Sequence, residues 1–509
     1  MTTNLTKKAA VAVCAASLAL GTFSCQNELL SPSPLTSLSD LVVFDTPERV
    51  ALQVSGMYRG VKAGGFLGGR FQVFNDIRAN DFINLTSNGV TGLGVWNHTL
   101  TEASQNDVVN TWTNGYTAIN RINVFLAGMD ANASKFVAPI FPATFAATTA
   151  ANYKGEARLL RALCYYSLLQ LYARPFADGN GGKPGLPLRL KGETGDTGND
   201  LARSTVAQVY AQILEDLTFA ELNLPLAYTA TTANTAAVLN GSRAHRNTAI
   251  ALKTRVYLSM ARYADVVTEA NKIVPAAAPF TATTGVPHAL NASVAAVFAP
   301  PQETPETIFS FPFTAQDAPG VQNQLAFYYL PAPAGNGEYS LNGAAGAILN
   351  NPGWAATDAR RTAFVLTAGT PANPQSFLRK YPTGNPYTDK APVIRYAEVL
   401  LNLAEARVRS TNSVDPQAVA LLNAVRGRSN AGGVYTAVGL GSVNATTNAL
   451  LLERRIEFLG EGIRNIDDMR LLATLPAKGS VPAIDAANPA YIWPIPSTEL
   501  QANKLMTRN

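Results

Sequence analysis

The chain has 509 residues, which is enough for one large core or for two domains. Charged residues make up only 15% and the formal net charge is +5, without a marked run of Lys or Arg, so nucleic acid is not an expected partner. The 38 Gly and 31 Pro residues predict many loops between the regular elements.

Residues 1–24 have the pattern of an export signal peptide. Two lysines precede an apolar run from Ala9 to Leu20, and small residues follow this run. Cys25 comes directly afterwards, where a lipoprotein signal peptidase would cut and where acyl chains would anchor the protein to a membrane. The alternative is an ordinary secretory signal with an incidental cysteine. The rest of the segment 25–40 is mostly polar and predicts a tether between the lipid and the folded part.

The first part of the mature chain combines a helix signal with a polar stretch. Thr46 as N-cap and Pro47 at the first helical position predict a helix that runs to about Tyr58. The stretch 71–100 is expected to be irregular, and it holds many side chains that are suited to recognition. The candidate ligand-binding residues in this stretch are Arg78, Asn80, Asp81, Trp96, Asn97 and His98.

A buried helix is predicted in the middle of the first half. Glu156 to Tyr172 contains no Gly or Pro and consists mostly of strong helix formers. Its apolar residues cover so much of the circumference that the helix is expected to lie between other helices. A long Gly-rich loop follows at 175–200. Similar signals predict further helices at 106–129, 205–224 (with Ser204 as the cap), 247–260, 264–274, 393–409, 416–428, 448–459 and 465–472.

The helices are expected to form hairpins of the tetratricopeptide type. Helix pairs with small residues at the crossing and Tyr at the turn, as at Tyr263, are typical of that repeat. We therefore predict a mostly α-helical fold, in which tetratricopeptide-like hairpins form a right-handed superhelix and an irregular, loop-rich part carries short strands such as Ile308–Phe313. The predicted division is a signal peptide at 1–24, a lipidated Cys and tether at 25–40, an N-terminal helical region at 41–274, a loop-rich insert at 275–391 and a C-terminal helical region at 392–509.

The sequence lacks the motifs of common catalytic and metal chemistry. None of the three histidines lies in an HExxH or CxxC context, so no metal or cofactor is predicted. Neither a GxSxG elbow nor a GxxxxGK[ST] loop occurs. The densest acidic cluster lies at 453–468, but four arginines are interleaved with it. Salt bridges within the last helix pair are therefore expected there, rather than the paired carboxylates of a glycoside hydrolase.

Aromatic residues occur in the non-helical parts, beside Asn, Asp and Arg. This combination suits a sugar, because the apolar face of a pyranose stacks on a ring while its hydroxyls bond to amides and charges. The alternative is that these rings fill the core of an irregular domain. Besides Trp96, the candidate rings are Tyr328, Tyr339 and Trp354.

Seven segments of the chain follow the order of motifs in a known family. Gly155 to Tyr166, reading GEARLLRALCYY and followed by Leu171 and Tyr172, resembles the GEAxFLRAxxYFxLxxLYG segment of SusD/RagB outer-membrane lipoproteins. Six further segments resemble motifs of that family: 114–123, 203–217, 249–258, 392–405, 422–428 and 453–464.

The resemblance implies a binding protein of the outer membrane. Members are lipid-anchored, face the cell exterior, and deliver oligosaccharides or related nutrients to a SusC-type TonB-dependent transporter without catalysing a reaction. The matched segments belong to the scaffold, so they identify neither the ligand nor its site. The alternative functions are a structural helical-repeat adaptor without a small ligand and, less favoured by the acidic residues, a surface glycoside hydrolase.

Overall fold

The computed structural model describes residues 42–195 and 197–509. The predicted signal peptide, the predicted lipidation at Cys25 and the predicted tether lie outside these residues. Within the described residues, no helix combines the length and the apolar character needed to cross a bilayer.

The chain divides into two compact units, Met1–Ala51 and Leu52–Asn509. Helix α2 (Pro47–Val61) begins in the first unit and ends in the second. The backbone N–H of Arg49 donates to Oγ1 of Thr46 (3.4 Å), which confirms the predicted N-cap. The elements that follow all belong to the second unit.

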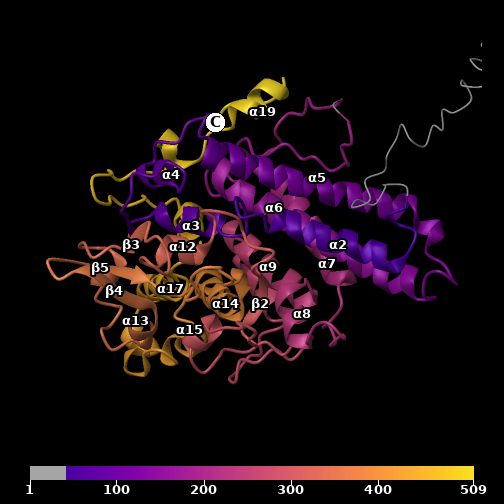
Figure 1. Ribbon diagram of the computed structural model, residues 1–509. Helices are drawn as coiled ribbons and strands as arrows, with labels where there is room; N and C mark the ends of the chain where they lie inside the picture. Colours follow the sequence, from indigo (N-terminus) through magenta and orange to yellow (C-terminus); the bar gives the residue numbers. More distant parts are fainter. Residues whose placement is uncertain (1–41, 196) are drawn as a thin grey trace, which may run out of the picture. The chain divides into compact units, whose positions relative to one another are not determined.

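The predicted buried helix is α6 (Ala150–Tyr172), which lies between α5 (Asn110–Ala131) and α7 (Val206–Asn223) (Figure 1). Nearly every side chain from residue 155 onward is buried, as the apolar circumference predicts. Gly115 permits the close approach of α5, since a Cβ there would lie 2.9 Å from the methyl carbons of Leu168. The cap of α7 is Thr205, one residue after the predicted one, because its hydroxyl accepts from the N–H of Gln208 and completes a capping box.

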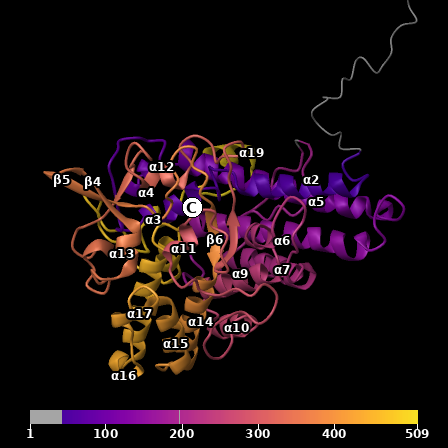
Figure 2. The ribbon, with the colours of Figure 1, turned by 60° about the horizontal axis from the view of Figure 1, so that its bottom comes forward.

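A second block of helices contains two hairpins that pack on each other (Figure 2). Helix α10 contacts α14, and α14 also contacts α17. The confirmed fold is therefore mostly helical with tetratricopeptide-like pairs. The bounds are α9 (Arg246–Ser259), α10 (Tyr263–Ala270), α14 (Tyr396–Thr411), α15 (Pro416–Gly427) and α17 (Val443–Glu457).

The described strands are short and pair antiparallel in three two-stranded sheets. The pairs are β1 (Phe82–Asn84) with β3 (Tyr339–Leu341), β2 (Thr307–Phe311) with β6 (Ala391–Arg395), and β4 (Val365–Thr370) with β5 (Asn373–Leu378). The predicted strand in the insert is thus β2. The prediction that a helix begins at Val393 is wrong, because residues 391–395 pair with β2 and α14 begins only at Tyr396.

The stretch 71–100 is more regular than predicted, because it contains α3, β1 and α4. All eight residues of α3 are buried, including polar ones. Oδ2 of Asp76 accepts from the N–H of Gly462 (3.0 Å) and from the hydroxyl of Tyr329 (3.2 Å), while burial raises the pKa of this carboxyl group well above its usual value. The remaining short helices are α3 (Arg70–Ile77), α4 (Leu93–Asn97), α8 (Ala236–Ser242), α11 (Ala295–Phe298), α12 (Leu325–Tyr329), α13 (Ala359–Phe364), α16 (Ala437–Leu440), α18 (Arg464–Arg470) and α19 (Ser497–Ala502).

A buried ion-pair network joins the insert to the C-terminal helices. Glu457 lies 2.6 Å from Arg428, 2.9 Å from Arg360 and 3.1 Å from Arg395. Burial opposes its ionisation, yet these three charges hold the pKa of Glu457 down at about 2. The predicted salt bridges within the last helix pair exist between Asp467 or Asp468 and the interleaved arginines. The glutamates of the cluster, in contrast, pair with basic side chains from outside that pair. The network comprises Glu306, Arg360, Lys380, Arg395, Arg426, Arg428, Glu453, Glu457 and Glu461.

Candidate functional site

A pocket of about 340 Å³ lies where the end of α3, the turn after α4 and the segment 488–494 meet. We call it the C-terminal pocket, and its volume lies within the range of roughly 300–1,000 Å³ that is usual for small-ligand sites. Two of the nine predicted ligand residues, Arg78 and His98, line it. The residues that matter most for its chemistry are Arg78, Val95, His98, Asn488, Ile492 and Trp493.

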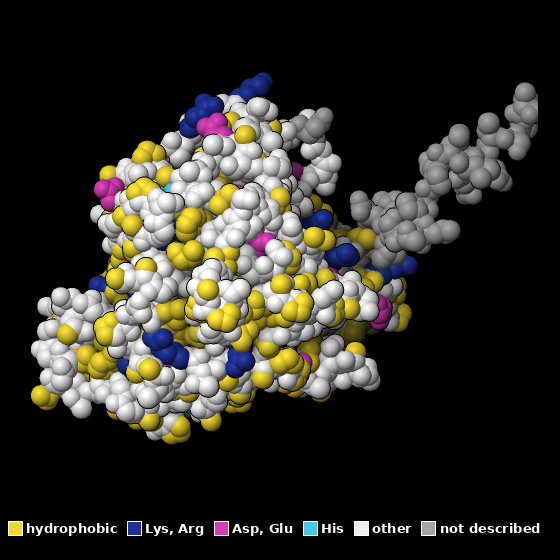
Figure 3. Space-filling view, turned by 60° about the vertical axis from the view of Figure 1, so that its left-hand side comes forward, with side chains coloured by type: hydrophobic (Ala, Val, Ile, Leu, Met, Phe, Trp, Pro, Cys, Tyr) yellow, Lys and Arg dark blue, Asp and Glu magenta, His cyan; other side chains and the backbone are white. Residues whose placement is uncertain are grey.

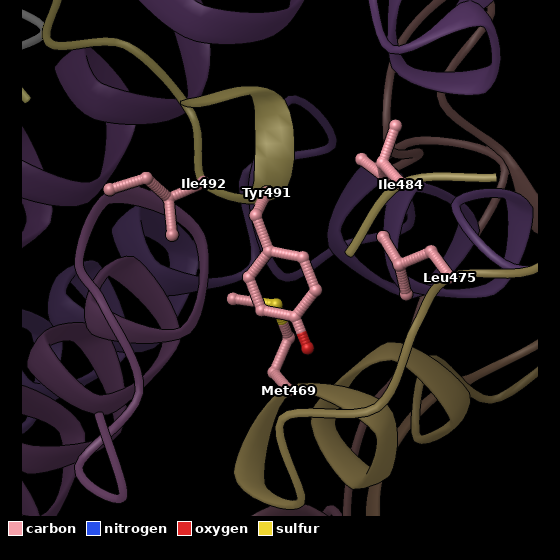
Figure 4. Packing of buried hydrophobic residues seen from close by; sticks show 5 residues of the cluster. All are labelled: Met469, Leu475, Ile484, Tyr491 and Ile492. Carbon is pink, nitrogen blue, oxygen red and sulfur yellow. The ribbon is translucent and has the colours of Figure 1, made fainter. Parts of the chain in front are cut away.

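A small hydrophobic cluster fixes the segment behind the pocket. The ring of Tyr491 lies over Met469, while Leu475 and Ile484 pack together beside them and Ile492 lies on the other side of the ring (Figure 4). The hydroxyl of Tyr491 donates to the carbonyl of Ala473 (2.8 Å), which holds the ring in place. The backbone at 490–492 is therefore a rigid wall.

Arg78 is the buried cation of the pocket, and its side chain is 1% exposed. Its Nη2 donates to the carbonyls of Ala490 (3.0 Å) and Tyr491 (2.8 Å), whereas Nη1 has only the sulfur of Met469 at 4.0 Å. Burial lowers the pKa of Arg78 to about 10, so the guanidinium still carries its charge at neutral pH.

Lys478 and Trp96 support the pocket from behind. Nζ of Lys478 donates to the carbonyls of Ile77 and Arg78 and lies 5.6 Å from the centre of the Trp96 ring. Burial, with the charge of Arg78 as the next cause, lowers the pKa of Lys478 well below its usual value. Trp96 is 7% exposed and its Nε1 donates to the carbonyl of Phe82 (3.0 Å). In this position its ring does not offer a face to solvent.

His98 ends α4 in a left-handed conformation, with φ of 57°. His adopts this conformation more readily than most residues. The preceding residue, Asn97, is half-buried. Both ring nitrogens of His98 are buried and have no hydrogen-bond partner among the described residues. Burial lowers the pKa of His98 to about 3, and the charges of Lys478 and Arg78 add to the effect, so the ring is neutral at physiological pH.

The predicted residues Asn80 and Asp81 are bound by a cation from α17. Nε of Arg455 donates to Oδ1 of Asp81 (2.8 Å), and Nη2 of Arg455 donates to the side-chain oxygen of Asn80 (3.2 Å). Asp81 is also 3.8 Å from Arg464. These two residues connect the end of α3 to the C-terminal helices, and they are not among the residues that line the C-terminal pocket.

The other three predicted rings lie in the core. Tyr328 and Tyr339 stack on each other at 6.3 Å, and their hydroxyls donate to the carbonyls of Gln322 (2.8 Å) and Thr91 (2.9 Å). Trp354 is buried elsewhere, under the guanidinium of Arg361 at 4.4 Å. This placement corresponds to the alternative interpretation, in which the rings fill the core, and a ligand-binding role for them stays a prediction.

Trp493 and Lys478 were not among the predicted site residues. Trp493 satisfies the criterion that selected the other rings, because it is an aromatic residue in a non-helical, proline-containing stretch, 493–496. Its ring packs against Phe74 and Tyr172, each at 5.5 Å, and is 1% exposed. Its Nε1 has no partner among the residues that the structure describes. For Lys478 the sequence carries no comparable signal.

Two further hollows have most of their polar groups engaged. One, of about 500 Å³, lies between α5, the loop at 187–201 and α19, and there the indole of Trp112 donates to Glu499 (3.2 Å). The other, of about 560 Å³, lies between α2, α8 and the end of β2, where Lys62 pairs with Asp317. On the face shown in Figure 3, charged side chains stand singly or in small groups. In the described ranges, no three His, Cys, Asp or Glu side chains gather as metal ligands.

Two family comparisons match different parts of the chain. The SusD family matches residues 375–509, and a family described as starch-binding and associating with the outer membrane matches residues 33–258. No match was found among curated protein sequences.

Solved structures match along nearly the whole chain. A SusD superfamily protein from Bacteroides fragilis has 30% identity and a TM-score of 0.77, with 91% of this chain and 100% of that chain covered. A SusD superfamily protein from Bacteroides thetaiotaomicron has 22% identity and the same TM-score, over 91% and 99% of the two chains. The surface glycan-binding protein A of Bacteroides uniformis has 21% identity and a TM-score of 0.67, also over 91% and 99%.

Proposed function

Because the chain belongs to the SusD family, we propose that it binds oligosaccharides at the outer membrane and delivers them to a SusC-type TonB-dependent transporter. The description of one matching family as starch-binding and the glycan-binding role of the Bacteroides uniformis protein support a carbohydrate ligand. Delivery and the transporter partner follow from the family resemblance. The adaptor alternative accounts for the helix pairs but gives no role to a ligand-sized pocket.

The C-terminal pocket is the observation that carries this proposal. It has the size of a small-ligand site, apolar walls from Val95 and Ile492, and nitrogen atoms on Arg78, His98 and Trp493 that can meet oxygen atoms of a ligand. A sugar needs this mixture, because its ring carbons contact apolar surface while its oxygens form hydrogen bonds. Of the nine predicted residues, Arg78 and His98 are therefore proposed to contact the ligand, and Trp96 to support the wall.

We expect binding without turnover. Glycoside hydrolysis needs two carboxylates that face one cleft, whereas Glu453, Glu457 and Glu461 are buried and paired with basic side chains. The pocket itself contributes no Asp or Glu side chain to its described lining. This arrangement supports capture of a nutrient over cleavage.

Calorimetric titration of the full-length protein in detergent, against a panel of oligosaccharides, tests the function. The same samples are analysed for products. Binding with unchanged oligosaccharide is the expected result. Cleavage would show that the protein is an enzyme, and a complete lack of binding would favour the adaptor alternative.

The membrane anchor is proposed to be a lipid on Cys25, with the folded part outside the cell. Cys25→Ala should move the protein out of the membrane fraction, because it removes the acylated atom. Variant and parent are compared by fractionation of cells that express either form. An unchanged membrane fraction for Cys25→Ala would contradict the lipid anchor.

A further inference from the structure

Two basic side chains, Arg78 and His98, line the C-terminal pocket, and Lys478 lies next to Arg78 outside its lining; none of the three has an acidic partner among the described residues. In the described part of the chain, no carboxylate oxygen lies within 4.0 Å of a side-chain nitrogen of Arg78, His98 or Lys478. Arg78 and Lys478 donate to backbone carbonyls, which carry only partial charges, and the ring nitrogens of His98 have no partner among the described residues. A buried cation normally has an anionic partner, because removing it from water is costly.

The nearest acidic side chains are already bound to other cations. Asp81 accepts from Arg455 at 2.8 Å, and Asp468 lies 3.1 Å from Arg464. Both carboxylates influence the pocket from a distance, since Asp468 raises the pKa of Arg78 and Asp81 raises that of Lys478. In each basic group, however, burial outweighs this effect and the pKa is lowered. Arg78 therefore keeps its charge, although no carboxylate of the described residues lies within 4.0 Å of its side-chain nitrogens.

The pocket also offers hydrogen-bond donors that are not used. Nε1 of Trp493 is a donor only, and it is buried without a partner in the part of the chain that the structure describes. A neutral His98 has one N–H that is likewise without a partner there. An indole and an imidazole donor beside a guanidinium match an acceptor with several lone pairs, such as a carboxylate.

We propose that the C-terminal pocket selects oligosaccharides that carry a carboxylate on the sugar, as uronic acids do. This inference rests on the proposed function, since it names the substrate class of the same site. The carboxylate supplies Arg78 with the anionic partner that the described residues do not provide, and it accepts from Arg78, Trp493 and His98. The sugar ring lies against the apolar wall that Val95 and Ile492 contribute.

The test uses matched pairs of ligands. Oligosaccharides of several uronic acids, for example oligogalacturonates, are titrated into the full-length protein in detergent, each beside the same oligosaccharide with its carboxylates methyl-esterified. The ester keeps ring and linkage and removes only the charge. We expect the acid form to bind at least about tenfold more tightly, since a hydrogen bond to a charged group contributes ~1.5–3 kcal/mol.

Two variants assign the preference to this pocket. Arg78→Gln removes the positive charge. Trp493→Phe removes one hydrogen-bond donor and keeps an aromatic ring. If Arg78→Gln does not fold, Trp493→Phe still tests the assignment. Both should weaken binding of the acid form more than binding of the ester, so that the preference for the acid form falls. Tyr116→Phe, in the separate hollow beside α19, should bind like the parent protein.

The outcomes separate this inference from the function itself. Equal affinity for acid and ester forms, or binding of neutral oligosaccharides alone, would overturn the acidic specificity and leave glycan capture standing. A preference for the acid form that persists in both variants would overturn the assignment to the C-terminal pocket. Binding of no oligosaccharide of either kind would contradict the inference and the proposed function together.

Discussion

Buried arginines have different partners in the buried ion-pair network and in the C-terminal pocket. In the network, Arg395 contacts the carboxylates of Glu306, Glu457 and Glu461. In the pocket, the polar contacts that Arg78 makes with the described residues are with two backbone carbonyls and a sulfur atom. Both guanidiniums are almost completely buried. The difference indicates which charges hold the fold together and which remain available to a ligand.

Electrostatics explains why this difference is informative. Removing a charge from water costs several kcal/mol, which a complete set of partners offsets and an incomplete set does not. In the network each guanidinium contacts at least one carboxylate, and these ion pairs connect the insert to the C-terminal helices. In the pocket, Arg78 has no anionic partner among the described residues. An anion that enters the pocket would therefore supply that partner.

The largest expected effect is loss of a carboxylate from the network. Glu457→Ala leaves Arg360, Arg395 and Arg428 without their shared partner, and we expect a loss of about 3–5 kcal/mol in the free energy of unfolding. Denaturant titration measures it. The matched control is Asp265→Ala, which removes an exposed ion pair with Arg262 and should change the stability far less. Equal losses in both variants would contradict a structural role for the network.

The second prediction concerns pH and two buried histidines outside the pocket. His245 and His288 stack at 5.2 Å, and burial lowers their pKa values to about 3 and about 4, with the charge of His288 also acting on His245. The folded state therefore favours the neutral rings, while the unfolded chain takes up protons below about pH 6.5. This stabilisation is fully present above pH 6.5 and is lost as the pH falls. We expect a loss of about 2 kcal/mol per histidine at pH 5.

Denaturant titration at pH 7 and pH 5 tests this loss in a window where the network does not interfere. The pKa of Glu457 is about 2, so its contribution is lost only as the pH falls from about 4.5 towards 2. His288→Gln should reduce the pH dependence between 7 and 5. Burial raises the pKa values of Asp107, Asp389 and Asp468 to about 7, about 6 and about 6, so these carboxyl groups titrate in the same window with the opposite effect on stability. The test is therefore the comparison with the variant: an equal pH dependence in the parent protein and in His288→Gln would contradict the assignment.

The smallest expected effect sharpens the comparison at a single atom. Trp493→Phe removes an N–H that has no partner among the described residues, so the free energy of unfolding should fall only by the packing loss of the smaller ring, without a hydrogen-bond contribution. Trp112→Phe removes an N–H that donates to Glu499, and it should cost about 1 kcal/mol or more. Thermal unfolding of both variants measures the two losses of stability. A loss for Trp493→Phe that exceeds the loss for Trp112→Phe would contradict this difference between the two N–H groups.

Much of the fold could be predicted from the sequence, because long runs with helical periodicity carry their own signal. Helix α6 is apolar around most of its circumference, and its burial follows from that pattern. In contrast, α3 holds Asn75 and Asp76 within the core, so the polar residues that suggest a loop are in fact buried and bonded. The start of α14 was misplaced for another reason, because residues 391–395 pair with a strand some 80 positions earlier in the sequence.

The candidate site was predictable only in part. Residue type identified Arg78 and His98, which line the pocket, but it also selected Tyr328 and Tyr339, whose rings stack inside the core. Residue type does not distinguish a ring that faces a ligand from one that faces its neighbours. The wall around Trp493 comes from a segment roughly 400 residues away from Arg78, and only the tertiary structure brings the two together.

A crystal structure of the protein with a bound acidic oligosaccharide tests most directly whether the C-terminal pocket binds the carboxylate of the sugar. We predict that the sugar occupies the C-terminal pocket, with its carboxylate within hydrogen-bond distance of Arg78 and of Nε1 of Trp493. An oligosaccharide bound elsewhere, for example in the hollow between α5 and α19, with the C-terminal pocket free of ligand, would contradict this prediction.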